Sequence, residues 1–301
     1  MRKWLLQQER RKAVGVLVQR LRCSTLLILI FMTLSPGQAT ADALVLGVHP
    51  FKPATQLSEM FAPLVAYLSK ELGEPVTLRV AKDYQTHIDA VGSDSLDIAC
   101  MDALSYVEMV EKYGQKPLLA RLSFGGNPTY QGKIFVGRDS PIQNLTDLKG
   151  KRFAFAEPHS TMGYLMPRYQ LWLAGVNIED FASYRFVGDH VNVTLGVLSG
   201  AFDAGAVKED VFYQYEARGL RAIATTMPVS YHLLMTGRHL PESKRQKLQN
   251  ILLGAHQNPQ GRSALQILTP GITKLSTVQD SDYDSLRTVL STIKKLEAPH
   301  P

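Results

Sequence analysis

Residues 153 to 164 read Phe153-Ala-Phe-Ala-Glu157-Pro158-His159-Ser160-Thr161-Met162-Gly163-Tyr164. The apolar run at residues 153–156 predicts a short buried strand, which Pro158 ends. Ser160 and Thr161 then precede a segment of helical periodicity at residues 164–174, and both residue types favour the start of a helix. The stretch therefore predicts a strand that leads through a loop into a helix.

The start of this helix has the chemistry of an anion-binding site. Its first N–H groups have no partner within the helix, and the helix dipole adds partial positive charge there. Together with the hydroxyl groups of Ser160 and Thr161, they form a socket for an oxyanion. The alternative is an ordinary helix cap, because Ser and Thr are preferred at helix starts whether or not a ligand binds.

Strand and helix patterns alternate on both sides of this stretch. Before it, strand-like runs lie at residues 44–49, 76–81, 96–100 and 133–138, and helical patterns lie at residues 55–72, 84–91 and 104–113. After it, strand-like runs lie at residues 184–187, 204–207, 220–225 and 231–236, and helical patterns lie at residues 192–199, 209–219, 242–256 and 282–295. Such alternation predicts an α/β protein with two lobes, each a mostly parallel sheet flanked by helices.

The first 41 residues have the pattern of a secretory signal peptide. Seven Lys and Arg residues precede an apolar run at residues 26–34, which is short for a membrane-spanning helix. Small residues allow cleavage after Ala41 or after Ala43. We expect export to the periplasm with cleavage of this segment, and an uncleaved N-terminal membrane anchor is the alternative.

Removal of residues 1–41 takes away seven of the 33 Lys and Arg residues and one of the 27 Asp and Glu residues, which leaves 26 of each. A near-neutral chain gives no support for binding to nucleic acid or to a membrane surface. Cys23 would leave with the signal peptide, so Cys100 remains as a lone thiol without an internal disulfide partner. It is either a small buried hydrophobic residue or a reactive group.

Six short motifs, in this order, resemble the phosphate/phosphite/phosphonate-binding periplasmic proteins of ABC importers. They are Leu44-Val-Leu-Gly-Val-His-Pro50, Leu96-Asp-Ile-Ala99, Tyr130-Gln-Gly-Lys-Ile-Phe-Val136, Leu145-Thr-Asp-Leu-Lys-Gly150, Ser160-Thr-Met-Gly163 and Ala204-Gly-Ala-Val207. The resemblance implies a type II periplasmic binding fold, in which two crossover strands join the lobes and the ligand lies between them. We therefore expect residues 42–130 and 235–301 to form lobe 1 and residues 131–234 to form lobe 2.

The resemblance also implies ligand contacts in lobe 2. Ser160, Thr161 and the backbone N–H of Gly163, with Met162 between them, match the family's loop that grips the oxyanion. His190 matches a histidine that reaches the oxyanion in phosphonate-binding members, although a lone histidine is often structural.

Asp210 matches a carboxylate that faces the ligand amine in aminophosphonate binders, although it could equally be a solvated residue at a helix start. Aminophosphonate binders also carry a second carboxylate near the returning strand. In this chain that region contains Tyr231 and His232 and no matching carboxylate. We therefore do not expect a zwitterionic aminophosphonate as the ligand.

In lobe 1 the expected ligand contacts are Phe51, Met101 and Asp102. Here the family commonly carries an aromatic residue followed by Gly-Pro, whereas this chain has Cys-Met-Asp-Ala. A carboxylate at Asp102 would oppose a dianion unless Lys52, His49 or a proton offsets its charge.

Cys100 supports an alternative function. Some sensor proteins within this family capture arsenite with a single cysteine in the cleft and report it to a membrane histidine kinase. A soft thiolate suits such a ligand, so Cys100 is a candidate arsenite ligand.

Catalytic, Walker and metal-binding motifs do not occur in the sequence. We therefore expect a binding protein that is not an enzyme, needs no cofactor or resident metal, and acts as a monomer. Its expected partners are a small oxyanion and either an ABC permease or the ectodomain of a sensor kinase.

Overall fold

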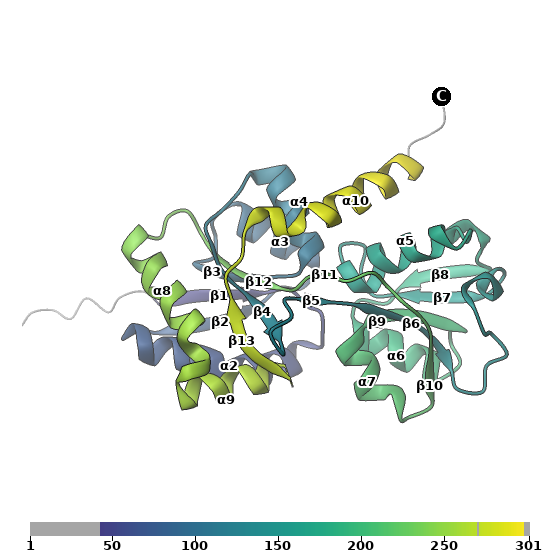
Figure 1. The fold of residues 1–301 in the computed structure, drawn as a ribbon, viewed down its shortest axis with the longest axis horizontal. Coiled ribbons are helices and arrows are strands. Elements are labelled where there is room, and N and C mark those ends of the chain that lie inside the picture. The colour runs from purple at the N-terminus through teal and green to yellow at the C-terminus, as the bar shows by residue number, and fades with distance from the viewer. Residues whose placement is uncertain (1–42, 270, 298–301) are drawn as a thin grey trace, which may run out of the picture. The chain divides into compact units, whose positions relative to one another are not determined.

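The computed structural model describes residues 43–269 and 271–297, and the predicted signal peptide at residues 1–41 lies outside them. Two β-sheets flanked by helices make up the described chain (Figure 1). Within it, no helix combines the length and the apolar character needed to cross a membrane.

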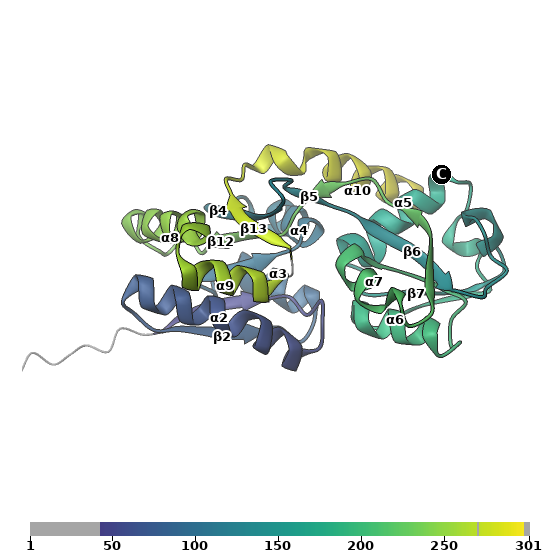
Figure 2. The same cartoon turned by 60° about the horizontal axis from the view of Figure 1, so that its bottom comes forward.

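The first sheet has six strands and is built from both ends of the described chain. Its order is β13 (Ile272–Ser276), β4 (Leu118–Phe124), β12 (Leu233–Thr236), β3 (Ile98–Met101), β1 (Leu44–Val48) and β2 (Val76–Val80). Its helices are α2 (Ala54–Leu72), α3 (Tyr84–Gly92), α4 (Ala103–Tyr113), α8 (Glu242–Gly254), α9 (Pro259–Leu268) and α10 (Asp284–Glu297). Helices α2 and α9, far apart in sequence, lie side by side (Figure 2).

The second sheet has five strands from the middle of the chain. Its order is β10 (Leu220–Thr225), β6 (Gly132–Gly137), β9 (Ala204–Lys208), β7 (Arg152–Phe155) and β8 (Ser183–Phe186). Its helices are α5 (Met166–Leu173), α6 (His190–Leu198) and α7 (Glu209–Glu216). The chain passes between the sheets through β5 (Thr129–Tyr130) and β11 (Val229–Ser230), which pair antiparallel.

The predicted α/β class with two flanked sheets is confirmed, and both sheets are mixed rather than mostly parallel. Strand β1 pairs parallel with β2 and β3, and β7 pairs parallel with β8 and β9. The remaining pairs in these two sheets are antiparallel, and each includes a strand next to a passage between the sheets: β4, β6, β10 or β12.

The strand predicted at residues 153–156 is β7, and its side chains alternate between two cores. Phe153 and Phe155 pack in one core, and Ala154 and Ala156 pack in the other. This alternation follows from the period of two in a strand. The loop after β7 begins at Glu157 and reaches the first sheet, whose core includes Met162.

Candidate functional site

The loop after β7 forms a helix start, as predicted. The side chain of Ser160 caps it by accepting a hydrogen bond of 3.0 Å from the N–H of Gly163. The first turn, Thr161–Leu165, is a π-helix, and α5 follows it directly. Single π-helical turns occur frequently at functional sites. The N–H of Ala156 donates to the carbonyl of Gly163 at 3.1 Å and holds this turn against the end of β7.

Gly163 has no room for a side chain. A Cβ there would lie 2.5 Å from the Ala156 Cβ, 2.7 Å from the Ser160 Oγ and 3.0 Å from the His190 Cε1. We expect Gly163→Ala to lower the free energy of unfolding by about 1 to 3 kcal/mol, because the overpacked turn must shift. Urea unfolding measures the change, with Gly137→Ala as the matched control because a Cβ there meets nothing within 4 Å. Equal stability of the two variants would show that the turn is not closely packed.

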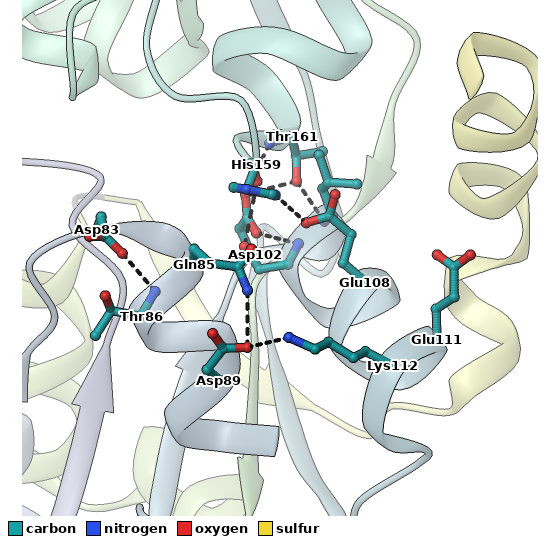
Figure 3. Close-up of polar contacts among 12 residues, drawn as sticks. Asp83, Gln85, Thr86, Asp89, Asp102, Glu108, Glu111, Lys112, His159 and Thr161 are labelled. Atoms are coloured by element: carbon teal, nitrogen blue, oxygen red, sulfur yellow. Dashed lines mark hydrogen bonds and ion pairs between the residues drawn. The ribbon is translucent and has the colours of Figure 1, made fainter. Parts of the chain in front are cut away.

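The Asp102 carboxylate accepts hydrogen bonds from both the N–H and the hydroxyl of Thr161, as Figure 3 shows. Its Oδ2 accepts from the Thr161 N–H at 3.0 Å and from the Thr161 hydroxyl at 2.9 Å. The Thr161 hydroxyl accepts in turn from the Leu104 N–H at 2.8 Å, and Asp102 Oδ1 accepts from the Ser105 N–H at 2.9 Å. A buried protein carboxylate therefore caps α4 and also sits at the start of the helix after β7.

A second pair joins the same two segments nearer the surface. Nδ1 of His159 lies 2.7 Å from a carboxylate oxygen of Glu108 on α4 (Figure 3). The hydrogen bond with Glu108 raises the pKa of His159 above its usual value of 6.5. Both side chains are partly exposed, in contrast to Asp102.

Four buried histidines lie close to this loop or to the neighbouring strand ends. His49 follows β1, His87 lies on α3, His190 begins α6 and His232 precedes β12. The His49 ring stacks on that of His232 at 5.2 Å between centroids and lies 5.9 Å from that of His87. Burial lowers the pKa of all four below 6.5, to about 3 for His87 and His190. They are therefore neutral at the pH of the periplasm.

Hydrogen bonds assign the tautomers of three of these rings. Nδ1 of His49 and Nε2 of His87 lie 3.3 and 3.0 Å from the carbonyl oxygen of Cys100, which only accepts, so both nitrogens carry the proton. Neutral His49 is therefore left with an unprotonated Nε2. Nδ1 of His190 accepts from the Lys208 N–H at 3.4 Å, so its proton is on Nε2.

Lys208, at the end of β9, places a buried ammonium group among aromatic rings. Its Nζ lies 4.9 Å from the ring centroid of Tyr231, 5.6 Å from that of Phe51 and 5.8 Å from that of Tyr130. Its ion pair is with Asp210, at 3.4 Å. Aromatic faces stabilise a cation but leave its N–H groups available to a hydrogen-bond acceptor.

Buried polar atoms without a hydrogen-bond partner gather around this ammonium. Among the described residues they include His49 Nε2, His232 Nδ1 and Asp210 Oδ1. We define His49, His190, His232, Lys208 and Asp210 as the buried polar cluster, to which both sheets contribute. Leaving such atoms unpaired costs about 1 to 3 kcal/mol each. A bound polar ligand would remove this cost.

A cleft of about 1110 Å³ adjoins the buried polar cluster. It is lined by residues of α2, α7, α9 and the passages between the sheets, including Lys52, Tyr130, Asp210 and Tyr231. Its volume lies slightly above the range of about 300 to 1,000 Å³ that is typical of small-molecule pockets. The cleft gives access from solvent to Asp210 and to the aromatic rings around Lys208.

The structure places several of the predicted ligand contacts in one apolar core or against one another. Phe51 packs 5.0 Å from the ring of His49, and His190 lies against Gly163. Met101 and Met162 lie in the apolar core of the first sheet, to which Phe51 also belongs.

Cys100 lies on β3 within the core of the first sheet. Burial raises the pKa of its thiol to about 12, so the thiol stays protonated at neutral pH. This is the environment of a small buried hydrophobic residue, and it does not favour the thiolate that the arsenite alternative requires.

Sequence reasoning did not include three members of the buried polar cluster among its candidate ligand contacts: His49, His232 and Lys208. The signal for Lys208 was present, because a lysine ends an otherwise apolar strand just before a Glu-Asp pair. His232 carried no local signal, since its position depends on stacking against His49, 183 residues earlier in the chain.

Comparisons with known proteins identify the family of this chain. Residues 46–283 match the family described as "ABC transporter, phosphonate, periplasmic substrate-binding protein". The chain is 25% identical over 248 residues to the phosphonates-binding periplasmic protein of Escherichia coli (strain K12). This match covers 78% of this chain and 73% of that protein. It is 29% identical over 197 residues to a probable ABC transporter phosphite binding protein of Prochlorococcus marinus (strain MIT 9301). This match covers 63% of this chain and 65% of that protein.

Solved structures share the fold. The structure of PhnD1 from Prochlorococcus marinus in complex with methylphosphonate has a TM-score of 0.77 at 22% identity, and the match covers 84% of this chain and 98% of that chain. A binding protein component of an ABC phosphonate transporter from Pseudomonas aeruginosa also gives 0.77, at 21% identity, covering 84% of this chain and 86% of that chain. These matches confirm the predicted two-lobed fold of type II periplasmic binding proteins.

Proposed function

The chain belongs to the family of periplasmic substrate-binding proteins of phosphonate ABC transporters, and we propose that it captures a small phosphorus oxyanion between its lobes and delivers it to an ABC importer. Members of this family bind substrates and are not enzymes, as the sequence predicted. The periplasm is the compartment in which the family acts.

The observation that carries this proposal is the buried polar cluster around Lys208. An ammonium group that is almost fully buried, at 2% exposure of the residue, has Asp210 as its anionic partner. Around it, His190 carries its proton on Nε2, and His232 Nδ1 has no hydrogen-bond partner among the described residues. An oxyanion accepts several hydrogen bonds at once, so it suits a cation and N–H groups that converge in a dry site.

The proposed ligand is phosphate, phosphite or a phosphonate. Lys208 and His190 would bind its oxygens, and the hydroxyl of Ser160 at the helix start would add a further donor. Phe51 would close the site from lobe 1. The adjoining cleft leaves room for the organic substituent of a phosphonate.

The transport cycle requires that the lobes close on the ligand. Residues 42–130 and 235–301 would form lobe 1 and residues 131–234 would form lobe 2, after removal of a signal peptide at residues 1–41. Ligand contacts with both lobes would shift the population toward the closed form, which a permease recognises. We propose that the protein does this as a monomer.

Calorimetric titration with phosphate, phosphite, methylphosphonate and arsenite tests the proposal. We expect one of the phosphorus oxyanions to bind with one-to-one stoichiometry, and the same affinity in Cys100→Ser, because the thiol is buried and protonated. Arsenite binding that Cys100→Ser abolishes, without binding of any phosphorus oxyanion, would contradict the proposal and support the sensor alternative.

A further inference from the structure

Resting on the proposed function, we propose that Asp102 determines which charge state of the ligand this site accepts: the site binds the oxyanion as a protonated monoanion and excludes the dianion. Asp102 is 3% exposed and forms hydrogen bonds to Thr161 and Ser105. The helix start after β7 therefore already holds an anion that belongs to the protein. A ligand must bind beside this carboxylate.

The charge of Asp102 reaches His49 in the buried polar cluster and two neighbouring tyrosines. Its carboxylate acts to raise the pKa of His49, against the larger lowering by burial. It also adds to the effect of burial in raising the pKa values of Tyr84 and Tyr130. A buried carboxylate so close to the site penalises each further negative charge, because little water is present to screen it.

The cations of the site are already matched by carboxylates. Lys208 pairs with Asp210, and the charge of Lys52 also interacts with Asp210. The buried histidines are neutral, and Asp102 adds a second negative charge. A dianionic ligand would therefore bring two buried negative charges without a matching cation, whereas a monoanion would bring one.

The site also offers acceptors that only a protonated ligand can use. Nε2 of neutral His49 is unprotonated, buried and without a partner, and Asp210 Oδ1 is likewise buried and without a partner. A P–OH group donates one hydrogen bond to either atom, and a fully ionised oxyanion has no proton to donate. Both the charge and the hydrogen-bonding pattern therefore favour the monoanion.

The groups that face Asp102 differ in whether they titrate near neutral pH. Burial raises the pKa of Cys100 to about 12 and those of Tyr84 and Tyr130 well above 10, and it lowers that of His49. Nearby, burial raises the pKa values of Glu157 and Asp189 above their usual values of 4.5 and 3.8, and Lys208 adds a fixed positive charge. The hydrogen bond with Glu108 raises the pKa of His159 above its usual value of 6.5. A test must therefore separate His159 from the ligand.

The test is calorimetric titration of the purified protein with inorganic phosphate, methylphosphonate and sulfate between pH 5.5 and 8.5. For the wild type we expect methylphosphonate affinity to fall about tenfold per pH unit above the ligand's second pKa, and sulfate to bind at least tenfold more weakly than phosphate. Asp102→Asn keeps one acceptor oxygen, which can still cap α4 through the Ser105 N–H, and replaces the charged oxygen beside Thr161 with a neutral amide group. This variant should bind the dianions at least tenfold more tightly than the wild type does.

Two control variants isolate Asp102. Glu108→Gln removes a carboxylate from the same helix, and His159→Asn removes the neighbouring group that titrates in this range; both should keep the wild-type preference. The inference is overturned if the wild type binds the dianion as tightly as the monoanion, or if Asp102→Asn, folded by circular dichroism, keeps the wild-type preference. If no phosphorus oxyanion binds to either protein at any pH, the proposed function fails and this inference fails with it.

Discussion

Lys208→Met is expected to abolish oxyanion binding, with a loss in affinity of at least a hundredfold. Methionine preserves most of the length and apolar volume of the side chain but removes the ammonium group. A charge-assisted hydrogen bond is worth about 1.5 to 3 kcal/mol, and more than one N–H group of Lys208 can reach an oxyanion. The aromatic rings of Phe51, Tyr130 and Tyr231 can still pack against the methionine side chain.

The same substitution should also destabilise the protein. It leaves Asp210 without its partner, and breaking a buried ion pair from one side costs about 3 to 5 kcal/mol. The double variant Lys208→Met with Asp210→Asn should recover stability without recovering binding, because it removes the unpaired charge but supplies no cation. This difference separates a role in binding from a role in folding.

Calorimetry and urea unfolding together measure both effects. Lys133→Met is the matched control, since Lys133 lies on the adjacent strand β6 and contacts Thr225 and Tyr213 at the surface. We expect the control to bind like the wild type. Retention of wild-type affinity in Lys208→Met, within about threefold, would exclude Lys208 from the ligand site.

Mild acid should destabilise the protein strongly, between pH 6.5 and pH 4.5. Burial holds the pKa of His87 and His190 at about 3, whereas both reach about 6.5 in the unfolded chain. Below pH 6.5 the unfolded state therefore binds more protons than the folded state, so stability falls as the pH falls. Each of these histidines removes about 1.4 kcal/mol per pH unit, or about 2.7 kcal/mol at pH 4.5.

Other titrating groups change the size of this effect but not its sign. His49 and His232 also have lowered pKa values and act in the same direction. His159 changes little in this range, because its pKa is raised: its stabilisation is fully present below pH 6.5 and is lost only as the pH rises through its folded pKa. His87 and His190 together lower the free energy of unfolding by about 5 kcal/mol at pH 4.5. This loss is comparable with the whole stability of many domains.

Urea unfolding at half-unit pH steps measures this dependence. His87→Gln provides the comparison, because glutamine can donate to the Cys100 carbonyl as His87 does but does not titrate. Its free energy of unfolding should vary by about 1.4 kcal/mol less per pH unit than that of the wild type. A wild-type free energy that stays constant between pH 6.5 and 4.5 would show that these histidines are not buried in the neutral form.

Local patterns predicted the elements near the helix start, because the chemistry there is local. The apolar run before Pro158 became β7, and Ser160 caps the following turn as its residue type predicts. The alternation of strands and helices predicted two α/β lobes. In these places, neighbours in sequence supply the strand period and the cap.

Elements that depend on distant partners were not predicted. Strands β4 and β13 pair with each other across about 150 residues, and neither has the clean alternation of a strand with one buried face. Helix α9 begins at Asn258-Pro259, which are turn residues as well as a cap and a first helical residue. Tertiary contacts decide these segments.

The candidate site shows the same limit. The negative charge of Asp102 was evident in the sequence, but its contacts with Thr161 depend on two segments 59 residues apart. The burial of Lys208 depends on rings from three separate segments, at Phe51, Tyr130 and Tyr231. A sequence shows which charges a site can contain, and the fold determines which of them face each other.

The most direct measurement of the central proposal is a crystal structure of the protein grown with methylphosphonate. We predict that the phosphorus atom lies in the buried polar cluster, with its oxygens bound by Lys208 and His190 and a protonated oxygen facing His49 Nε2 or Asp210 Oδ1. A ligand bound elsewhere, with Lys208 still paired to Asp210 and with His49 Nε2 and His232 Nδ1 still without hydrogen-bond partners, would contradict the proposal.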